Sequence, residues 1–302
     1  MEDDLDGGPV YYEDVAPTHV LQLPDSLKEL KLDDEVAAVD RMLEYVMVPL
    51  TTTLRLEVTL QGYWERTREE RIAKLVALCS KIPGARHIPL ATLEFSSISR
   101  MVGWERYKPH SLDRDDLGHR RFDVSFDVDD EDKGPHSQYT RAVASGLDFR
   151  GTACLILDHC DHIGEADFFC IFAGMKDLRE VSITSCQLKQ VLGMVGIQSW
   201  KDRLRKEPNF VPAIAGPGAL WPVLETMTIK TSYSLLMQCW PTLLRALEHR
   251  SKWRIDIKSL AIVVDSFPRD HIERCKADLK RFVRKVSIDV PHDWKWDPKH
   301  HH

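Results

Sequence analysis

Cysteine and histidine side chains gather in one short stretch of the chain, CLILDHCDHIGEADFFC at residues 154–170. Thiolate and imidazole are preferred ligands of zinc, which binds structurally through four converging groups usually supplied as two spaced pairs. Here only Cys160 and His162 form a tight pair, and no second CxxC or HxxxH motif follows. We therefore predict no metal and no other cofactor. The alternative is a metal-dependent enzyme or a zinc-binding protein that uses this cluster.

A sequence repeat accounts for Cys160 without a metal. In CLILDHC and LREVSITSC, two apolar residues flank one polar or exposed position, and a cysteine follows the second apolar residue by three. Cys160 and Cys186 therefore hold equivalent positions. A small polar side chain at such a position turns inward after a strand and bonds to backbone groups. We predict that both are buried thiols.

Other short motifs fail on their spacing. An EF-hand that began at Asp127 would need Gly and Glu at its sixth and twelfth positions, where Asp132 and Gln138 stand, so DVDDEDKG indicates a solvated acidic turn. The loop AGPGAL at residues 215–220 lacks the third glycine and the lysine of nucleotide-binding loops. There is no GxSxG or HExxH motif. These observations predict that the protein is not an enzyme.

Composition and charge exclude several classes of protein. The 302 residues are 43% hydrophobic and 29% charged, which is typical of a folded chain. The formal net charge of -6 argues against a nucleic-acid partner, because such proteins neutralise phosphates. Seven cysteines, no apolar segment of membrane-spanning length and the acidic start MEDDLDGG predict a reduced cytoplasmic or nuclear protein with no membrane partner.

The alternation of apolar residues recurs along the chain as a series of strand signals. Equivalent positions are 24 residues apart from Leu32 to Leu56, and 26 apart from Leu157 to Ile183 and again between the last two copies. These spacings match the period of leucine-rich repeats, whereas two longer gaps of 39 and 46 residues hold inserted loops. We predict parallel neighbouring strands at residues 29–33, 53–58, 180–184, 226–230, 259–264 and 285–289.

Helical periodicity fills the stretches between strands, as in TREERIAKLVALCSKI and DHIERCKADLKRFV. The predicted fold class is therefore α/β: an irregular leucine-rich-repeat solenoid with parallel strands on one face and helices on the other. The solenoid should be a single domain over residues 21–290, with insertions near 99–150 and 201–222. Within the first insertion, RFDVSFDVDDEDKG predicts a strand that belongs to an irregular repeat or to an inserted hairpin.

The two ends of the chain lie outside this domain. Residues 1–20 form an acidic arm, and residues 291–302 form a tail whose final HHH is native or the remnant of a purification tag.

With LPDSLKELKL, LRLEV, LDHCDHIG, MKDLREVSITSC and LWPVLETMTIK in view, residues 20–290 resemble the leucine-rich region of fungal F-box proteins, especially those of mushroom-forming fungi. The resemblance implies a substrate receptor of a ubiquitin ligase. The F-box that precedes the repeats in that family is not recognisable here, because LQLPDSLKEL at residues 21–30 follows the repeat pattern instead. A cullin adaptor is thus an expected partner only through an F-box outside this chain.

The same alternation predicts a working surface. Side chains between the apolar positions of a strand point away from the core, since side chains alternate between the faces of a sheet. Their mixed charges suit a protein or peptide partner better than a uniformly charged polymer, and the alternative is that they are only solvated sheet positions. We predict a protein-binding module whose binding residues are Lys31, Arg55, Glu57, Glu94, Asp158, Ser182, Thr184, Thr228, Lys230, Val263 and Asp289.

Overall fold

A computed structural model describes most of the chain. It covers residues 20–60, 67–82, 90–96, 100–105, 120–127, 137–147, 149, 151–160, 163, 165–172, 174–184, 188–196 and 221–291. Five predicted features lie wholly or mostly outside these residues: the acidic arm, the insertion at 201–222, the C-terminal tail, Cys186 and His162.

Ten strands form one sheet, and the sheet is mostly parallel. The six predicted strands are all present and pair in parallel with their neighbours. Along the sheet the order is β12 (Lys285–Asp289), β11 (Ser259–Val264), β10 (Thr226–Thr231), β9 (Glu180–Thr184), β8 (Cys154–Asp158), β5 (Thr92–Ser96), β6 (Arg100–Trp104), β7 (Arg120–Asp127), β4 (Thr53–Thr59) and β2 (Glu29–Glu35). A separate parallel pair joins β1 (Leu21–Gln22) to β3 (Val46–Met47).

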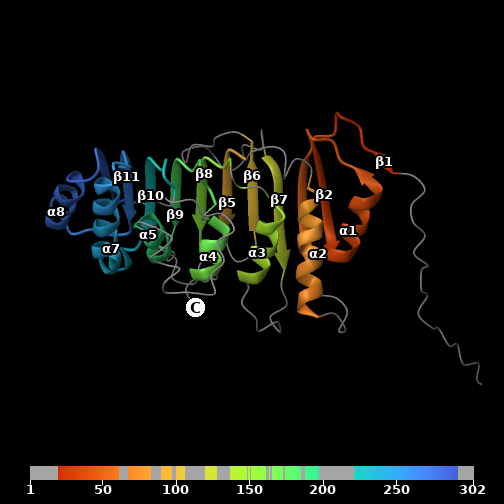
Figure 1. Ribbon diagram of the computed structural model, residues 1–302, viewed down its shortest axis with the longest axis horizontal. Coiled ribbons are helices and arrows are strands. Elements are labelled where there is room, and N and C mark those ends of the chain that lie inside the picture. The colour runs from red at the N-terminus through yellow and green to blue at the C-terminus, as the bar shows by residue number, and fades with distance from the viewer. Residues whose placement is uncertain are drawn as a thin grey trace, which may run out of the picture.

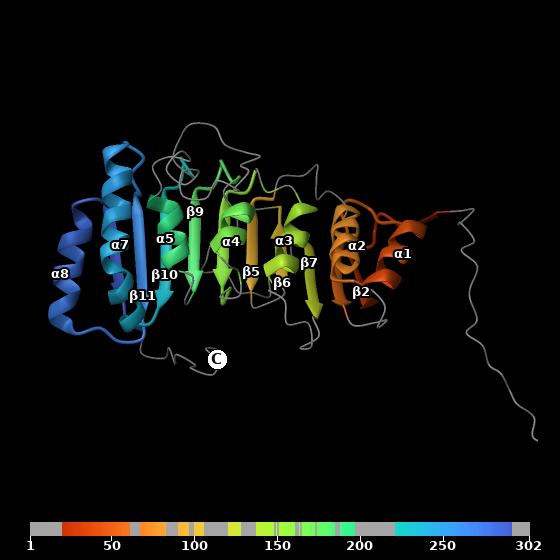
Figure 2. The same cartoon turned by 60° about the horizontal axis from the view of Figure 1, so that its bottom comes forward.

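The helices lie in a row along one side of this sheet (Figures 1 and 2). Each contacts the next along the row from α1 to α7. They are α1 (Val36–Tyr45), α2 (Arg68–Ser80), α3 (Ser137–Ser145), α4 (Glu165–Phe172), α5 (Leu188–Gly196), α7 (Tyr233–Lys252) and α8 (Arg269–Lys280). No helix in the described ranges is long and apolar enough to cross a membrane. The fold is therefore mixed α/β, with helices along one side of a mostly parallel sheet.

Burial alternates along β4, β10 and β11 as the sequence pattern predicts. In β4, Leu54, Leu56 and Val58 are at most 2% exposed, while the residues between them are partly exposed. The inward side chains pack with the helices into one hydrophobic cluster that extends along the sheet. Burial of this apolar surface is the main source of stability of such a layered fold.

The N-terminus of α2 is fixed by two side chains of its own first turn. Thr67 accepts a hydrogen bond from the backbone N–H of Glu70, and the Glu70 carboxylate accepts one from the backbone of Thr67. This reciprocal capping box satisfies two N–H groups that a helix start leaves free. The helix predicted from TREERIAKLVALCSKI is therefore capped at Thr67 and begins at Arg68.

A buried arginine ties α7 to the segment before β10. Arg250 is 2% exposed, and its guanidinium donates hydrogen bonds to the carbonyl oxygens of Trp221, Leu224 and Ile255 at 3.1, 3.2 and 3.0 Å. Burial lowers the pKa of Arg250 to about 10. These bonds hold the polar backbone of a turn inside the core, where an unsatisfied carbonyl would be costly.

Within the region near 99–150, the described strands β6 and β7 belong to the sheet, which decides between the two alternatives left open for the strand in RFDVSFDVDDEDKG. After β5 the chain reverses, so that β6 pairs antiparallel with β5 and β7 pairs antiparallel with β6. The predicted strand in RFDVSFDV is β7, and β4 pairs in parallel with it instead of with β5. Gly103 lies opposite Phe122, and a Cβ at Gly103 would stand 2.5 Å from the Phe122 ring. The close approach of β6 and β7 therefore requires glycine at this position.

Candidate functional site

The side of the sheet away from the helices carries the predicted binding residues. We call this side the outer face. The cross-strand pairing places them in two rows, each made of one residue from every strand. Lys31, Arg55, Glu94, Ser182 and Thr228 belong to one row. The other row contains Glu57, Asp158, Thr184, Lys230, Val263 and Asp289.

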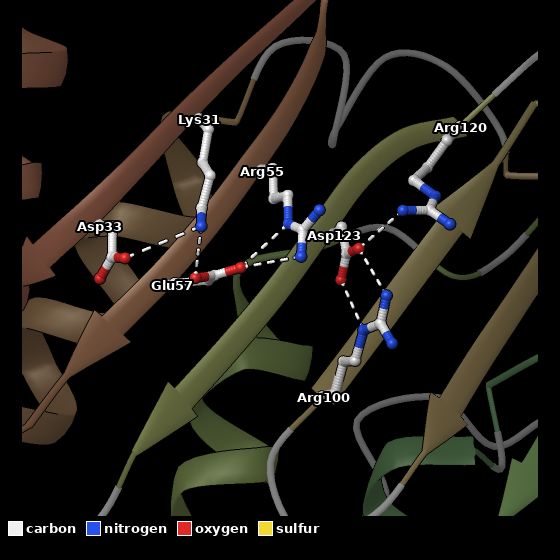
Figure 3. A network of polar contacts seen from close by, with 7 residues as sticks. All are labelled: Lys31, Asp33, Arg55, Glu57, Arg100, Arg120 and Asp123. Carbon is white, nitrogen blue, oxygen red and sulfur yellow. Dashed lines mark hydrogen bonds and ion pairs between the residues drawn. The ribbon is translucent and has the colours of Figure 1, made fainter. Parts of the chain in front are cut away.

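Charged side chains on β2 and β4 form an ion network at one end of this face (Figure 3). Glu57 lies at its centre, with one carboxylate oxygen 2.7 Å from Lys31 Nζ and the other accepting a hydrogen bond of 3.0 Å from Arg55 Nε. Lys31 also lies 3.7 Å from Asp33. The hydrogen bond from Lys31, aided by Arg55, lowers the pKa of Glu57 against the opposing effect of burial. Glu57 is therefore ionised at neutral pH.

A second network on β6 and β7 lies beside the first. Arg100 donates two hydrogen bonds to the Asp123 carboxylate, at 2.8 and 2.7 Å, and Arg120 donates a third at 2.8 Å (Figure 3). Asp123 is 2% exposed and pairs across the strands with Arg55. The hydrogen bond to Asp123 raises the pKa of Arg100. The neighbouring strands β2, β4, β7 and β6 thus carry fixed charges of both signs.

Asp123, Arg100 and Arg120 are not among the binding residues that the sequence pattern predicts. Asp123 stands in the alternating stretch RFDVSFDV, so its outward direction could be read from the pattern. Its ion-pair partners could not be predicted in this way, because the sequence gives no signal for a strand at residues 100–104.

The carboxyl ends of β2, β4 and β7 enclose a shallow hollow next to these networks. Its volume is about 360 Å³. The lining includes three carboxylates and two hydroxyls, contributed by Asp33, Glu57, Thr59, Ser125 and Asp127, together with Val58 and Phe126. The hollow is therefore acidic, while the cationic side chains lie further along the strands.

One part of the outer face, on β9, is less accessible than predicted. Ser182 points to this side, yet it is 2% exposed, so it is not available for binding in this structure. Glu180, on the same side, is 7% exposed, and burial raises its pKa. Toward β12, Lys230 and Val263 are partly exposed and Asp289 is exposed, and on the central strands Glu94, Asp158 and Thr184 are partly exposed as well. Ser182 is thus the one predicted binding residue that is buried.

The cysteine cluster adopts the predicted arrangement at the residues that the structure describes. Cys160 is 1% exposed, and its thiol donates to the carbonyl oxygens of Phe95 and Asp158 at 3.4 and 3.5 Å. Cys154 opens β8 and Cys170 lies on α4. His162 is outside the described residues, and within them no three His, Cys, Asp or Glu side chains are grouped to hold a metal.

Burial also controls the chemistry of the described thiols. It raises the pKa of Cys79 and of Cys154 to about 12, and it raises the pKa values of Cys239 and Cys275. A thiol with a raised pKa is protonated at neutral pH, whereas the thiolate is the nucleophile and metal ligand. These four cysteines are structural.

The geometry defines a class of protein: a mixed α/β chain with a single row of helices and an outer sheet face that carries ordered charges of both signs. Comparisons with models of protein families, with curated proteins and with solved structures found no match.

Proposed function

We propose that the chain is a protein-binding module, built as an irregular leucine-rich-repeat solenoid, which receives a protein or peptide on its outer face. Two observations support the solenoid. Strand and helix alternate along much of the chain, and from β8 to β12 the strands follow one another in sequence order. The helices also stack as a single row in which each packs on the next. A stack of this kind leaves one face of the sheet uncovered along its length.

The observation that carries the proposal is the ordered network around Glu57. Lys31 and Arg55 are held by hydrogen bonds to the same carboxylate, yet their side chains remain 47% and 39% exposed. Binding usually costs conformational entropy when long charged side chains become ordered. Here the ordering precedes binding, so a partner meets charges that are already positioned on rigid strands.

The mixture of charges favours a protein partner over a polyanion. Glu57 and Asp123 each pair with two cations, and the carboxylates of Asp33 and Asp127 in the adjoining hollow bring the negative charges to four, equal to the four cations. A phosphate backbone would meet repulsion there, whereas complementary patches of both signs select a specific protein surface.

We propose no catalytic activity and no cofactor for this face. Glu57 and Asp123 each accept hydrogen bonds from two cationic side chains, so both carboxylates are committed to ion pairs. A general base needs a pKa near the working pH, but the pKa of Glu57 is lowered.

The resemblance to fungal F-box proteins extends this proposal. It would make the outer face a receptor for ubiquitin-ligase substrates in the cytoplasm or nucleus. Contact with a cullin adaptor would require an F-box outside this chain.

Affinity capture with matched variants tests the proposal. The tagged full chain, the face variant Arg55→Glu/Lys230→Glu and the control Lys252→Glu/Lys276→Glu are used to capture proteins from the source cells, and mass spectrometry identifies them. The control reverses two charges on α7 and α8, on the helical side. We expect proteins that the wild type and the control recover and the face variant loses.

Thermal unfolding of each variant separates lost binding from lost structure. The midpoints should agree within about 3 °C, because these side chains lie outside the hydrophobic cluster and their ion pairs are at the surface, where such pairs contribute about 1 kcal/mol or less. Recovery of the same proteins at equal yield by the folded face variant would show that binding occurs away from the outer face.

A further inference from the structure

Exposed apolar side chains are concentrated at the β2 end of the molecule. Of the eight large apolar side chains that are exposed in the described residues, five lie between residues 20 and 50: Val20, Leu21, Met42, Met47 and Leu50, at 53, 62, 44, 58 and 56%. At the opposite end, residues 269–291 expose one, Val290 at 37%. Single exposed apolar residues are common, but a group of them marks an interaction site.

Several of these side chains line a cavity. It has a volume of about 870 Å³ and lies between β1, the end of α1, β3 and the turn that follows. Leu43 and Val46 contribute to its wall, and Val20, Met47 and Leu50 lie at its exposed side. The parallel pairing of β1 with β3, extended by a hydrogen bond from the N–H of Leu23 to the carbonyl of Met47, fixes this wall. The volume is in the range of cavities that bind ligands.

The surroundings of this cavity are acidic. Its lining includes the carboxylate of Glu44. Lys81 also lines the cavity, but its ammonium lies 2.6 Å from Asp40 and 2.9 Å from Glu44 and is neutralised. Asp25 adds a further carboxylate to the lining. A second copy of the chain would bring the same carboxylates to the contact, so electrostatic repulsion disfavours self-association here.

We propose that this surface, named the apolar end by its residues Val20, Leu43, Val46, Met47 and Leu50, receives an amphipathic helix of a partner protein. Apolar side chains of that helix enter the cavity, and lysine or arginine residues beside them face the carboxylates. A helix fits better than an added strand, because β1 and β3 have two residues each and offer a short edge. This site is separate from the outer face and does not depend on its function.

A displayed library of helical peptides tests the inference. The full chain is used for selection, and the enriched peptides are measured by fluorescence anisotropy against the wild type, Met47→Ser/Leu50→Ser and the control Val223→Ser/Trp253→Ser. All four side chains are exposed, at 58, 56, 41 and 56%, so each variant should fold. We expect cationic peptides with apolar residues at helical spacing, bound at least tenfold more weakly by the first variant and equally by the control.

Other results would overturn the inference. Enriched peptides that are acidic, or that bind Met47→Ser/Leu50→Ser as tightly as the wild type, would contradict it. Peptides that resemble PVYYEDV, residues 9–15, would assign the surface to the chain itself. A dimer in sedimentation experiments that the same variant dissociates would assign it to a second copy.

Discussion

Substitution of Asp123 by asparagine should destabilise the protein far more than a comparable change on the open surface. The carboxylate has a side chain 3% exposed and accepts three hydrogen bonds, from Arg100 and Arg120. The Arg120 side chain is 9% exposed, so it would keep a charge with little water and, among the residues that the structure describes, no counter-ion. Removing one partner of a buried pair costs about 3 to 5 kcal/mol. Arg100 is 42% exposed and contributes less.

Because asparagine still accepts one hydrogen bond, we expect a loss of about 2 to 3 kcal/mol in the free energy of unfolding. With a urea m value of roughly 3 kcal/mol per M, the unfolding midpoint should fall by roughly 0.7 to 1 M. Circular dichroism during urea unfolding measures this shift. Asp33→Asn is the control, since Asp33 is 62% exposed and lies 3.7 Å from Lys31.

A double-mutant cycle identifies the cause. If the stranded charge on Arg120 accounts for the loss, the free-energy costs of Asp123→Asn and Arg120→Gln should be less than additive by about 1 to 2 kcal/mol. Equal midpoints for Asp123→Asn and Asp33→Asn, or strict additivity in the cycle, would refute this reasoning.

Three further predictions concern other buried or paired groups. Lys31→Ala should raise the pKa of Glu57, as measured by carboxyl NMR. The lowered pKa of Glu57 stabilises the fold above about pH 4 and this stability is lost on acidification, so the wild type should lose more stability than Lys31→Ala between pH 6 and 3. Arg250→Gln should cost about 3 kcal/mol in urea unfolding, because three main-chain carbonyl oxygens lose their buried donors. Cys79 and Cys154 should resist a disulfide reagent at pH 8 in the folded chain and react once urea unfolds it, whereas labelling of the native protein at either residue would contradict their raised pKa values.

Alternation in the sequence was sufficient to locate strands with one polar face. Leu54, Leu56 and Val58 are buried and the residues between them are not, so the period of two is visible in the sequence. It was not sufficient for β6. Met101, Val102, Gly103 and Trp104 are all buried, and a strand buried on both faces shows no alternation.

For the candidate site, the sequence predicted which side chains point outward, but not which of them are accessible or which partners they contact. The outward direction of Lys31, Arg55 and Glu57 follows from local pattern alone, and the structure brings these three together. Whether an outward residue is accessible does not follow, as Ser182 demonstrates. The contact between Arg100 and Asp123 depends on which strands pair, and their separation of 23 residues gives no local signal for it.

The reversed block β5–β6–β7 has a consequence for how the chain acquires its structure. Its antiparallel pairs are the only ones among the described strands, and β5 and β6 are joined by three residues, 97–99. Short connections close quickly, whereas each parallel pair must wait for a crossover through a helix. We expect ordering to begin in this hairpin and spread outward in both directions. In the folded protein, hydrogen exchange in the ten-stranded sheet should then be slowest at its middle and fastest at its two edge strands, β2 and β12.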